Sequence, residues 1–176
     1  MARVSLIEPN QHPELEPIID KIRSGRRGTV INVYKLLLHS PRIAEVWLDL
    51  INAVRWDVTL DDRLREIVII RIGYLNHCAY VVNQHVPLHS TPAGLSDEEC
   101  RALADWQDAR CFSERERAAL AFTDASTREV AVPDVVFAAL KPHFNERQIV
   151  ELTVLTGTYN MHTRMCQALQ IDPQPK

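Results

Sequence analysis

The sequence contains little glycine and no long apolar run. Only 5 of its 176 residues are glycine, turn clusters are few, and Leu, Ala, Arg and Glu are abundant. This composition indicates an all-α protein. No apolar stretch reaches the length of about 18 residues that a membrane span requires, and the first residues lack the apolar core of a signal peptide. We therefore expect a cytoplasmic protein that does not bind a membrane.

Neither an excess of one charge nor paired cysteines are present. The 20 basic and 23 acidic residues give a net charge of -3, which disfavours nucleic acid or an anionic membrane as a partner. We expect a small neutral or anionic substrate instead. The cysteines at positions 78, 100, 111 and 166 have no short paired spacing, so reduced thiols are a better interpretation than a disulfide scaffold or a zinc site. We expect no cofactor and no metal.

Capping signals divide the chain into helices within a single domain that spans residues 1–176. Pro9, Pro13 and Pro17 predict an extended N-terminal arm over about residues 1–20, before a short helix. Ser40 precedes Pro41, and Ser96, Ser113 and Asn145 each stand three residues before a Glu or Gln, which is the spacing of a capping box. The predicted helices cover residues 29–38, 41–55, 61–75, 77–86, 97–106, 114–124, 134–141 and 146–168.

The segment from Arg63 to His89 contains the strongest candidates for a site. An apolar run over residues 67–75 predicts a buried helix, and Asn76 is placed to cap the next one. Cys78 would then lie at a helix N-terminus, where the helix dipole favours a thiolate. His85 falls on nearly the same face but about 10 Å further along the axis. The two side chains should therefore not hydrogen-bond directly, and the position between them, Val81, is inert.

Glu66 and His85 are the candidates for proton transfer. Glu66 lies in an apolar helical segment, so it either pairs with Arg63, Arg65 or Arg71, or has a pKa raised toward neutrality that suits a general acid or base. The imidazole of His85 titrates near pH ~6.5. Its alternative role is a stabilising charge at a helix end, because Pro87 follows. His89 has the spacing of a metal partner for His85, but Pro87 should interrupt the helix.

The order of Glu66, Cys78 and His85, with Tyr80 between, resembles the carboxymuconolactone decarboxylase and alkylhydroperoxidase D (AhpD) family. Further segments carry the same resemblance: NVYKLLLHSP, LDDRLRE, CAYVVNQHVPLH, AGLSDEE, FSERERAALAFTDA and VELTVLTGTYNMHTRM. The resemblance implies an AhpD-like helical bundle that assembles as a homo-oligomer, a trimer or a hexamer. In the peroxidase branch of this family, a second cysteine stands where this chain has Val81, and a histidine stands where it has Tyr80.

These observations leave three hypotheses for function. The leading one is a small-molecule enzyme of the decarboxylase or isomerase type, in which Glu66 and His85 exchange protons with a substrate, Cys78 assists and Tyr80 contacts the substrate. The second is a one-cysteine peroxidase that uses Cys78 and an external thiol. The third is a non-catalytic oligomeric ligand-binding protein. The sequence does not identify the substrate.

Overall fold

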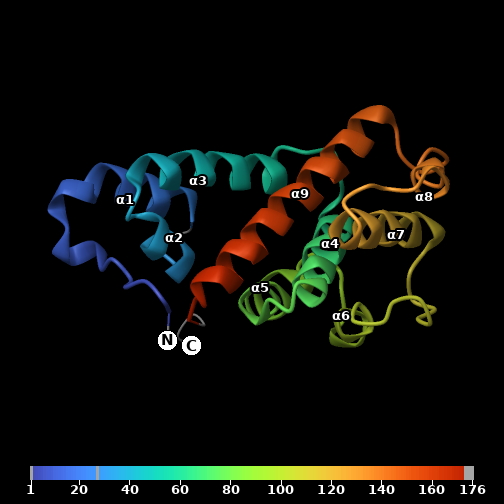
Figure 1. The fold of residues 1–176 in the computed structure, drawn as a ribbon, viewed down its shortest axis with the longest axis horizontal. Helices are drawn as coiled ribbons and strands as arrows, with labels where there is room; N and C mark the ends of the chain where they lie inside the picture. The colour runs from blue at the N-terminus through green and yellow to red at the C-terminus, as the bar shows by residue number, and fades with distance from the viewer. Residues whose placement is uncertain (1, 27, 173–176) are drawn as a thin grey trace.

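The protein is a bundle of α-helices (Figure 1). The structure is a computed structural model that describes residues 2–172 apart from residue 27, so Met1 and residues 173–176 of the predicted domain lie outside the described residues. Within the described part of the chain there is no strand. This confirms the predicted all-α fold. The helices are α1 (Glu16–Gly25), α2 (Asn32–Leu37), α3 (Pro41–Trp56), α4 (Asp62–Leu75), α5 (Ala79–His85), α6 (Asp97–Ala102), α7 (Glu114–Arg128), α8 (Asp134–Ala138) and α9 (Glu146–Leu169).

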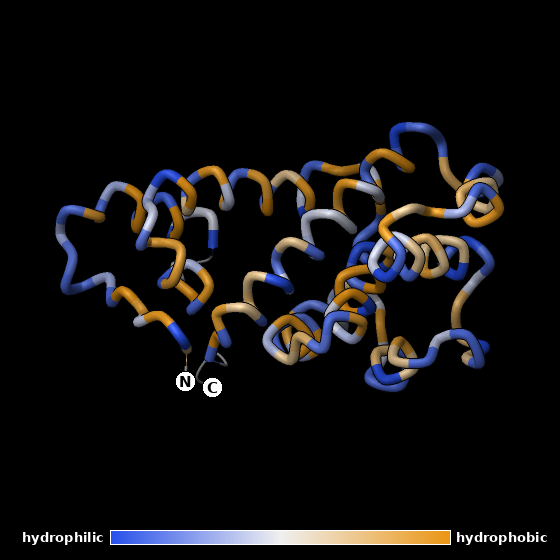
Figure 2. Tube along the Cα trace, viewed as in Figure 1, coloured by the Kyte–Doolittle hydropathy of each residue, from blue (hydrophilic) through white to orange (hydrophobic). Residues whose placement is uncertain are grey.

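The long helix α9 runs diagonally through the molecule, with α1 and α2 toward one end and α6 to α8 toward the other (Figure 1). It packs against α3, α4 and α7, while α4 also packs against α5 and α7. Figure 2 shows apolar and polar residues alternating along α3, as expected for a helix with one buried face. By contrast, α4 is buried on two sides, because Ile69 belongs to the main apolar cluster and Ile67 to a second one beside α6. Its nearly continuous apolar run follows from this double burial.

The local capping signals predicted most helix starts correctly. Ser96, Ser113 and Asn145 each form a complete capping box. Ser40 makes no side-chain cap, although Pro41 does open α3. The prediction that Asn76 caps the next helix was wrong. Asn76 follows the last residue of α4, Cys78 itself holds the N-cap position of α5, and the Asn76 amide is used for tertiary contacts with α9.

The N-terminal region contains the short helix that was expected after the arm, but this helix begins earlier than expected. Helix α1 begins at Glu16, inside the range of the predicted arm, and buries Ile19 and Ile22. Before it, the chain makes single 3-10 turns at Pro9–Gln11 and Pro13–Leu15. The residues before these turns lie against the end of α9, because the Arg3 N–H donates to the Leu169 carbonyl at 2.8 Å. The two ends of the described chain therefore lie side by side, as Figure 1 also shows.

A wide turn separates α5 from the following loop. Residues Val86–Ser90 form a π-helical turn that contains Pro87. Helix α5 therefore ends at His85, and the chain continues directly into the π-helical turn. Helix α5 lies very close to α4 at Gly73, where a Cβ atom would stand 2.8 Å from a methyl carbon of Val82. A side chain at position 73 would push apart the two helices that carry Glu66 and His85. Within residues 2–172, apart from residue 27, no helix is both long and apolar enough to cross a bilayer.

Candidate functional site

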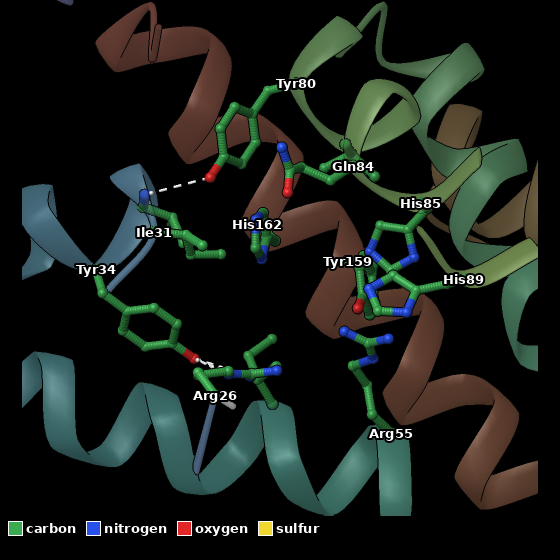
Figure 3. Close-up of a pocket in the computed structure, with 13 residues that line it drawn as sticks. Arg26, Ile31, Tyr34, Arg55, Tyr80, Gln84, His85, His89, Tyr159 and His162 are labelled. Atoms are coloured by element: carbon green, nitrogen blue, oxygen red, sulfur yellow. Dashed lines mark hydrogen bonds between the residues drawn. The ribbon is translucent and has the colours of Figure 1, made fainter. Parts of the chain in front are cut away.

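A small, partly open cavity of about 60 Å³ lies between the α2 and α3 side of the molecule and helices α5 and α9 (Figure 3). Three histidines, three tyrosines and two arginines are among the residues that line it, so its wall is rich in polar groups. The lining residues are Arg26, Ile31, Val33, Tyr34, Ile51, Arg55, Tyr80, Val81, Gln84, His85, His89, Tyr159 and His162.

Glu66 and His85 form a buried pair at the wall of this cavity. The Nδ1 atom of His85 lies 2.6 Å from Oε2 of Glu66, and a guanidinium nitrogen of Arg55 lies 3.5 Å from Oε1 of Glu66. Glu66 therefore stands behind His85 and does not itself line the cavity.

The predicted arginine partners of Glu66 were wrong. Arg63 binds Glu99 and Glu116, Arg65 binds Asp62, and Arg71 binds Asp124. The true arginine partner, Arg55, comes from α3 and is separated from Glu66 by a loop, so it was not visible as a neighbour on the same helix.

Burial and charge fix the protonation states of this pair. For Glu66, burial is the largest single influence and raises the pKa, but the combined effect of His85 and Arg55 lowers it below its usual value. The expected rise of the Glu66 pKa toward neutrality was therefore wrong. For His85, burial and the charges of Arg55 and Arg26 together lower the pKa more than Glu66 raises it. At neutral pH the carboxylate is ionised and the imidazole is neutral. An ionised carboxylate only accepts hydrogen bonds, so Nδ1–H of His85 donates and Nε2 keeps its lone pair.

Two arginines give the cavity a positive wall. The Arg26 guanidinium donates to the Tyr34 hydroxyl from two nitrogens at 3.0 and 2.8 Å. The guanidinium of Arg55 extends from α3 toward His85 and His89 (Figure 3) and also lies 4.6 Å from the Trp56 ring centre. Among the described residues, no carboxylate forms an ion pair with Arg26. Glu66 offsets the charge of Arg55 alone, which leaves the site with an excess of positive charge.

Helix α9 contributes two stacked rings to the cavity. His162 stacks on Tyr159 with 5.6 Å between ring centres and 8° between planes, and Tyr159 meets the His85 ring edge-on at 5.5 Å. Nδ1 of His162 is buried without a hydrogen-bond partner. Burial lowers the pKa of His162 to about 3 and raises that of Tyr159 to about 12. Both side chains are therefore neutral, and His162 has an unused polar atom. Sequence reasoning did not select either residue for the site.

Tyr80 and His89 also line the cavity. The Tyr80 hydroxyl accepts a hydrogen bond of 3.4 Å from the Val33 N–H, and burial raises the pKa of Tyr80. The rings of His85 and His89 are 5.1 Å apart. Pro87 does end the α-helix, but the π-helical turn brings His89 back beside His85. Within residues 2–172 apart from residue 27, no group of three or more His, Cys, Asp or Glu residues could hold a metal ion.

Cys78 lies outside the cavity lining and contacts a second thiol, that of Cys166 on α9. Each of the two residues is 1% exposed. The hydrogen bond from Cys166 is the largest influence on Cys78, and with the N–H groups of Val81 and Tyr80 it outweighs burial and lowers the Cys78 pKa to about 7. Burial and the same contact raise the pKa of Cys166. An acidic Cys78 thiol was expected from its helix N-terminus, but the partner thiol was not, because it lies 88 residues further along the chain.

The fold is an all-α bundle, and its likeness to a solved AhpD-like structure confirms the predicted AhpD-like fold. The sequence model of the carboxymuconolactone decarboxylase family matches residues 41–125, which include Glu66, Cys78 and His85. This match confirms the family resemblance expected from the sequence. It is 33% identical over 116 residues to the uncharacterized protein YnjA of Escherichia coli, a match that covers 65% of this chain and 63% of YnjA, less than two thirds of that relative's length.

Solved structures support the same assignment. A protein of unknown function from Agrobacterium tumefaciens, linked to the antioxidant defence protein AhpD, is 28% identical to this chain, with a TM-score of 0.75 over 80% of this chain and 97% of that one. The debrominase Bmp8 is 19% identical, with a TM-score of 0.80 over 97% of this chain and 91% of its own. The second likeness is one of fold alone.

Proposed function

We propose that the protein is a small-molecule enzyme in which His85 transfers protons at the cavity and Glu66 holds His85 in place. The observation that carries this proposal is the 2.6 Å contact between His85 Nδ1 and the Glu66 carboxylate, with the imidazole on the cavity wall. A neutral imidazole held by a carboxylate through one nitrogen presents the other nitrogen as a base.

The pair suits a reaction in which a proton is removed and returned. His85 accepts a proton from the substrate, and the Glu66 carboxylate stabilises the imidazolium that forms, because it favours the charged form of His85. Returning the proton to a different carbon isomerises the substrate. Delivering a proton to the carbanion left by loss of carbon dioxide completes a decarboxylation. Both reactions belong to the decarboxylase or isomerase type expected from the sequence.

The cavity restricts the substrate by size and charge. A volume of about 60 Å³ favours a small molecule as the substrate. Arg26 and Arg55 favour an anion, and a carboxylate matches the fork of a guanidinium. We therefore expect a small carboxylate, such as a short keto acid, as the substrate class.

Deuterium exchange tests the base directly. Pyruvate, acetoacetate and oxaloacetate would be incubated with the reduced protein in deuterium oxide, and loss of the α-proton signal followed by NMR. The wild type should accelerate exchange of at least one probe, and His85→Gln should reduce that rate by about 10²–10⁴. His143→Gln is the matched control, because His143 does not line the cavity. Equal rates for wild type and His85→Gln with every probe would overturn the proposal.

A one-cysteine peroxidase that uses Cys78 is the second candidate. It is favoured by the Cys78 pKa of about 7, which provides a thiolate near neutral pH. The burial of Cys78 and its position outside the cavity lining favour the His85 mechanism as the leading proposal. Hydroperoxide consumption that is lost in Cys78→Ser but kept in His85→Gln would reverse this order.

A further inference from the structure

We propose that Cys78 and Cys166 form a reversible disulfide, a redox site assembled from the start of α5 and the end of α9. This site is independent of the His85 chemistry. The chain has Val81 three residues after Cys78, so no second thiol is available within α5. Cys166 supplies that thiol from a distant part of the sequence.

Several contacts tie the two segments together beside the sulfur atoms. The Gln167 side chain donates to the carbonyls of Asn76 and His77 at 3.2 and 2.6 Å, next to Cys166 on one side and Cys78 on the other. The Asn76 amide donates to Asn160 and Thr163 at 2.9 and 2.8 Å. These bonds fix the loop before Cys78 against the last turns of α9. The two thiols are therefore held in contact by the fold and do not meet by chance.

The two sulfurs have different roles. The Cys166 S–H donates to Cys78, and the N–H groups of Tyr80 and Val81 also point to Cys78. Cys78 is thus the thiolate, with a pKa of about 7, and Cys166 stays protonated. The thiolate is the nucleophile in thiol chemistry. Cys78 therefore attacks first, and Cys166 resolves the product.

A small hydroperoxide, for which we choose hydrogen peroxide, is the oxidant in this scheme. The Cys78 thiolate attacks one peroxide oxygen, the O–O bond breaks, and the leaving oxygen takes a proton to become water. Cys78 is then a sulfenic acid. Cys166 sulfur attacks Cys78 sulfur, the S–O bond breaks, and the hydroxyl leaves as a second water with the Cys166 proton. Two thiols lose two electrons and the peroxide gains them. An external dithiol reduces the disulfide by exchange.

The other two cysteines serve as internal controls. Cys100 is buried, with burial raising its pKa against a hydrogen bond to Ser90. Cys111 is exposed. If exposure alone decided reactivity, Cys111 would be the first thiol to be oxidised. If Cys78 and Cys166 form a disulfide, their two free thiols should be lost together. The pattern of oxidation thus separates a built pair from general thiol reactivity.

Peptide mapping tests the pair. Trypsin leaves Cys78 and Cys100 in one peptide, residues 72–101, and Cys166 in another, residues 165–176. The experiment therefore uses the full chain with Cys100→Ala. After brief treatment with hydrogen peroxide and a quench with N-ethylmaleimide, non-reducing mass spectrometry should show the two peptides cross-linked. Dithiothreitol added before the quench should restore both as maleimide adducts.

A second variant identifies the attacking sulfur. In Cys166→Ser with Cys100→Ala, peroxide should convert Cys78 to a sulfenic acid that dimedone traps, whereas Cys78→Ser should leave Cys166 reduced. The proposal is overturned if the cross-linked peptide is absent while Cys111 is oxidised, or if dimedone labels Cys78 equally with and without Cys166. The readout needs no substrate, so its failure is separate from failure of the deuterium exchange, which is measured on reduced protein.

Discussion

Replacing His162 with phenylalanine should stabilise the protein progressively as the pH falls. His162 is buried in the wall of the cavity, where its ring stacks on Tyr159 and its Nδ1 has no partner. Phenylalanine keeps an aromatic ring in contact with Tyr159 and removes both the unpaired nitrogen and the titrating group. The variant thus isolates the cost of holding a neutral histidine in this position.

The magnitude follows from the two pKa values. The pKa of His162 is about 3 in the folded protein, against 6.5 for an unperturbed histidine. The unfolded chain binds the proton more readily, so stability is complete above pH 6.5 and is lost as the pH falls toward the folded value. The loss is about 1.4 kcal/mol per pH unit, or about 2 kcal/mol by pH 5. The lowered pKa of His85 adds a loss of the same sign in both proteins.

Urea unfolding at a fixed protein concentration, repeated from pH 7.5 to pH 5, measures this effect. The difference in unfolding free energy between His162→Phe and wild type should grow by about 2 kcal/mol over that range. His143→Phe, at a position outside the cavity, should show no comparable growth. If the curves of wild type and His162→Phe run parallel, then His162 is protonated or hydrated in the folded protein, and the reasoning from its burial is wrong.

Three further predictions address other parts of the molecule. Arg71→Met should lower the unfolding free energy by about 3–5 kcal/mol in urea titrations, because Arg71 binds Asp124 through two hydrogen bonds of 2.7 and 2.6 Å. Adding Asp124→Leu should restore part of this loss, because it removes the buried carboxylate left without its partner. Val81→Cys should raise hydroperoxide turnover with dithiothreitol, since Val81 lines the cavity and a thiol there lies one helical turn from Cys78; unchanged turnover would show that Val81 does not limit peroxide chemistry. We also propose a homo-oligomer, so sedimentation at micromolar concentration should give a mass above 20.1 kDa, and Val154→Glu, on the apolar face of α9 that is 44% exposed at this residue, should shift it toward the monomer.

The sequence predicted the parts of the fold that depend on neighbouring residues. Ser113 and Glu116 form a capping box through atoms three residues apart, and such a pattern is readable without the rest of the chain. Asn76 shows the limit of the same argument. Its spacing suited a cap, but tertiary hydrogen bonds to Asn160 and Thr163 on α9 took its amide. The local preference of Asn76 for a helix cap was therefore overridden by tertiary partners that the sequence pattern does not reveal.

The residues of the candidate site also fall into a part that the sequence predicted and a part that it did not. Glu66 and His85 lie 19 residues apart, within one recognisable segment, and the sequence selected both. The direction of the Glu66 pKa depends on Arg55 and on the geometry of the His85 contact, so it was not predictable from burial alone. His162 reaches the cavity, and Cys166 reaches Cys78, only through the tertiary packing of α9. Residues that far away in sequence give no spacing signal of their own.

Helix α9 has a consequence for how this protein can change over generations. Tyr159, His162 and Cys166 are separated by three and four residues, so they share one face of a single helix. The cavity wall and the thiol contact are therefore inherited together. Inserting one residue before Tyr159 would turn all three side chains by about 100° and remove both features at once. In lineages of this protein, the length of α9 from Tyr159 to Cys166 should therefore stay constant.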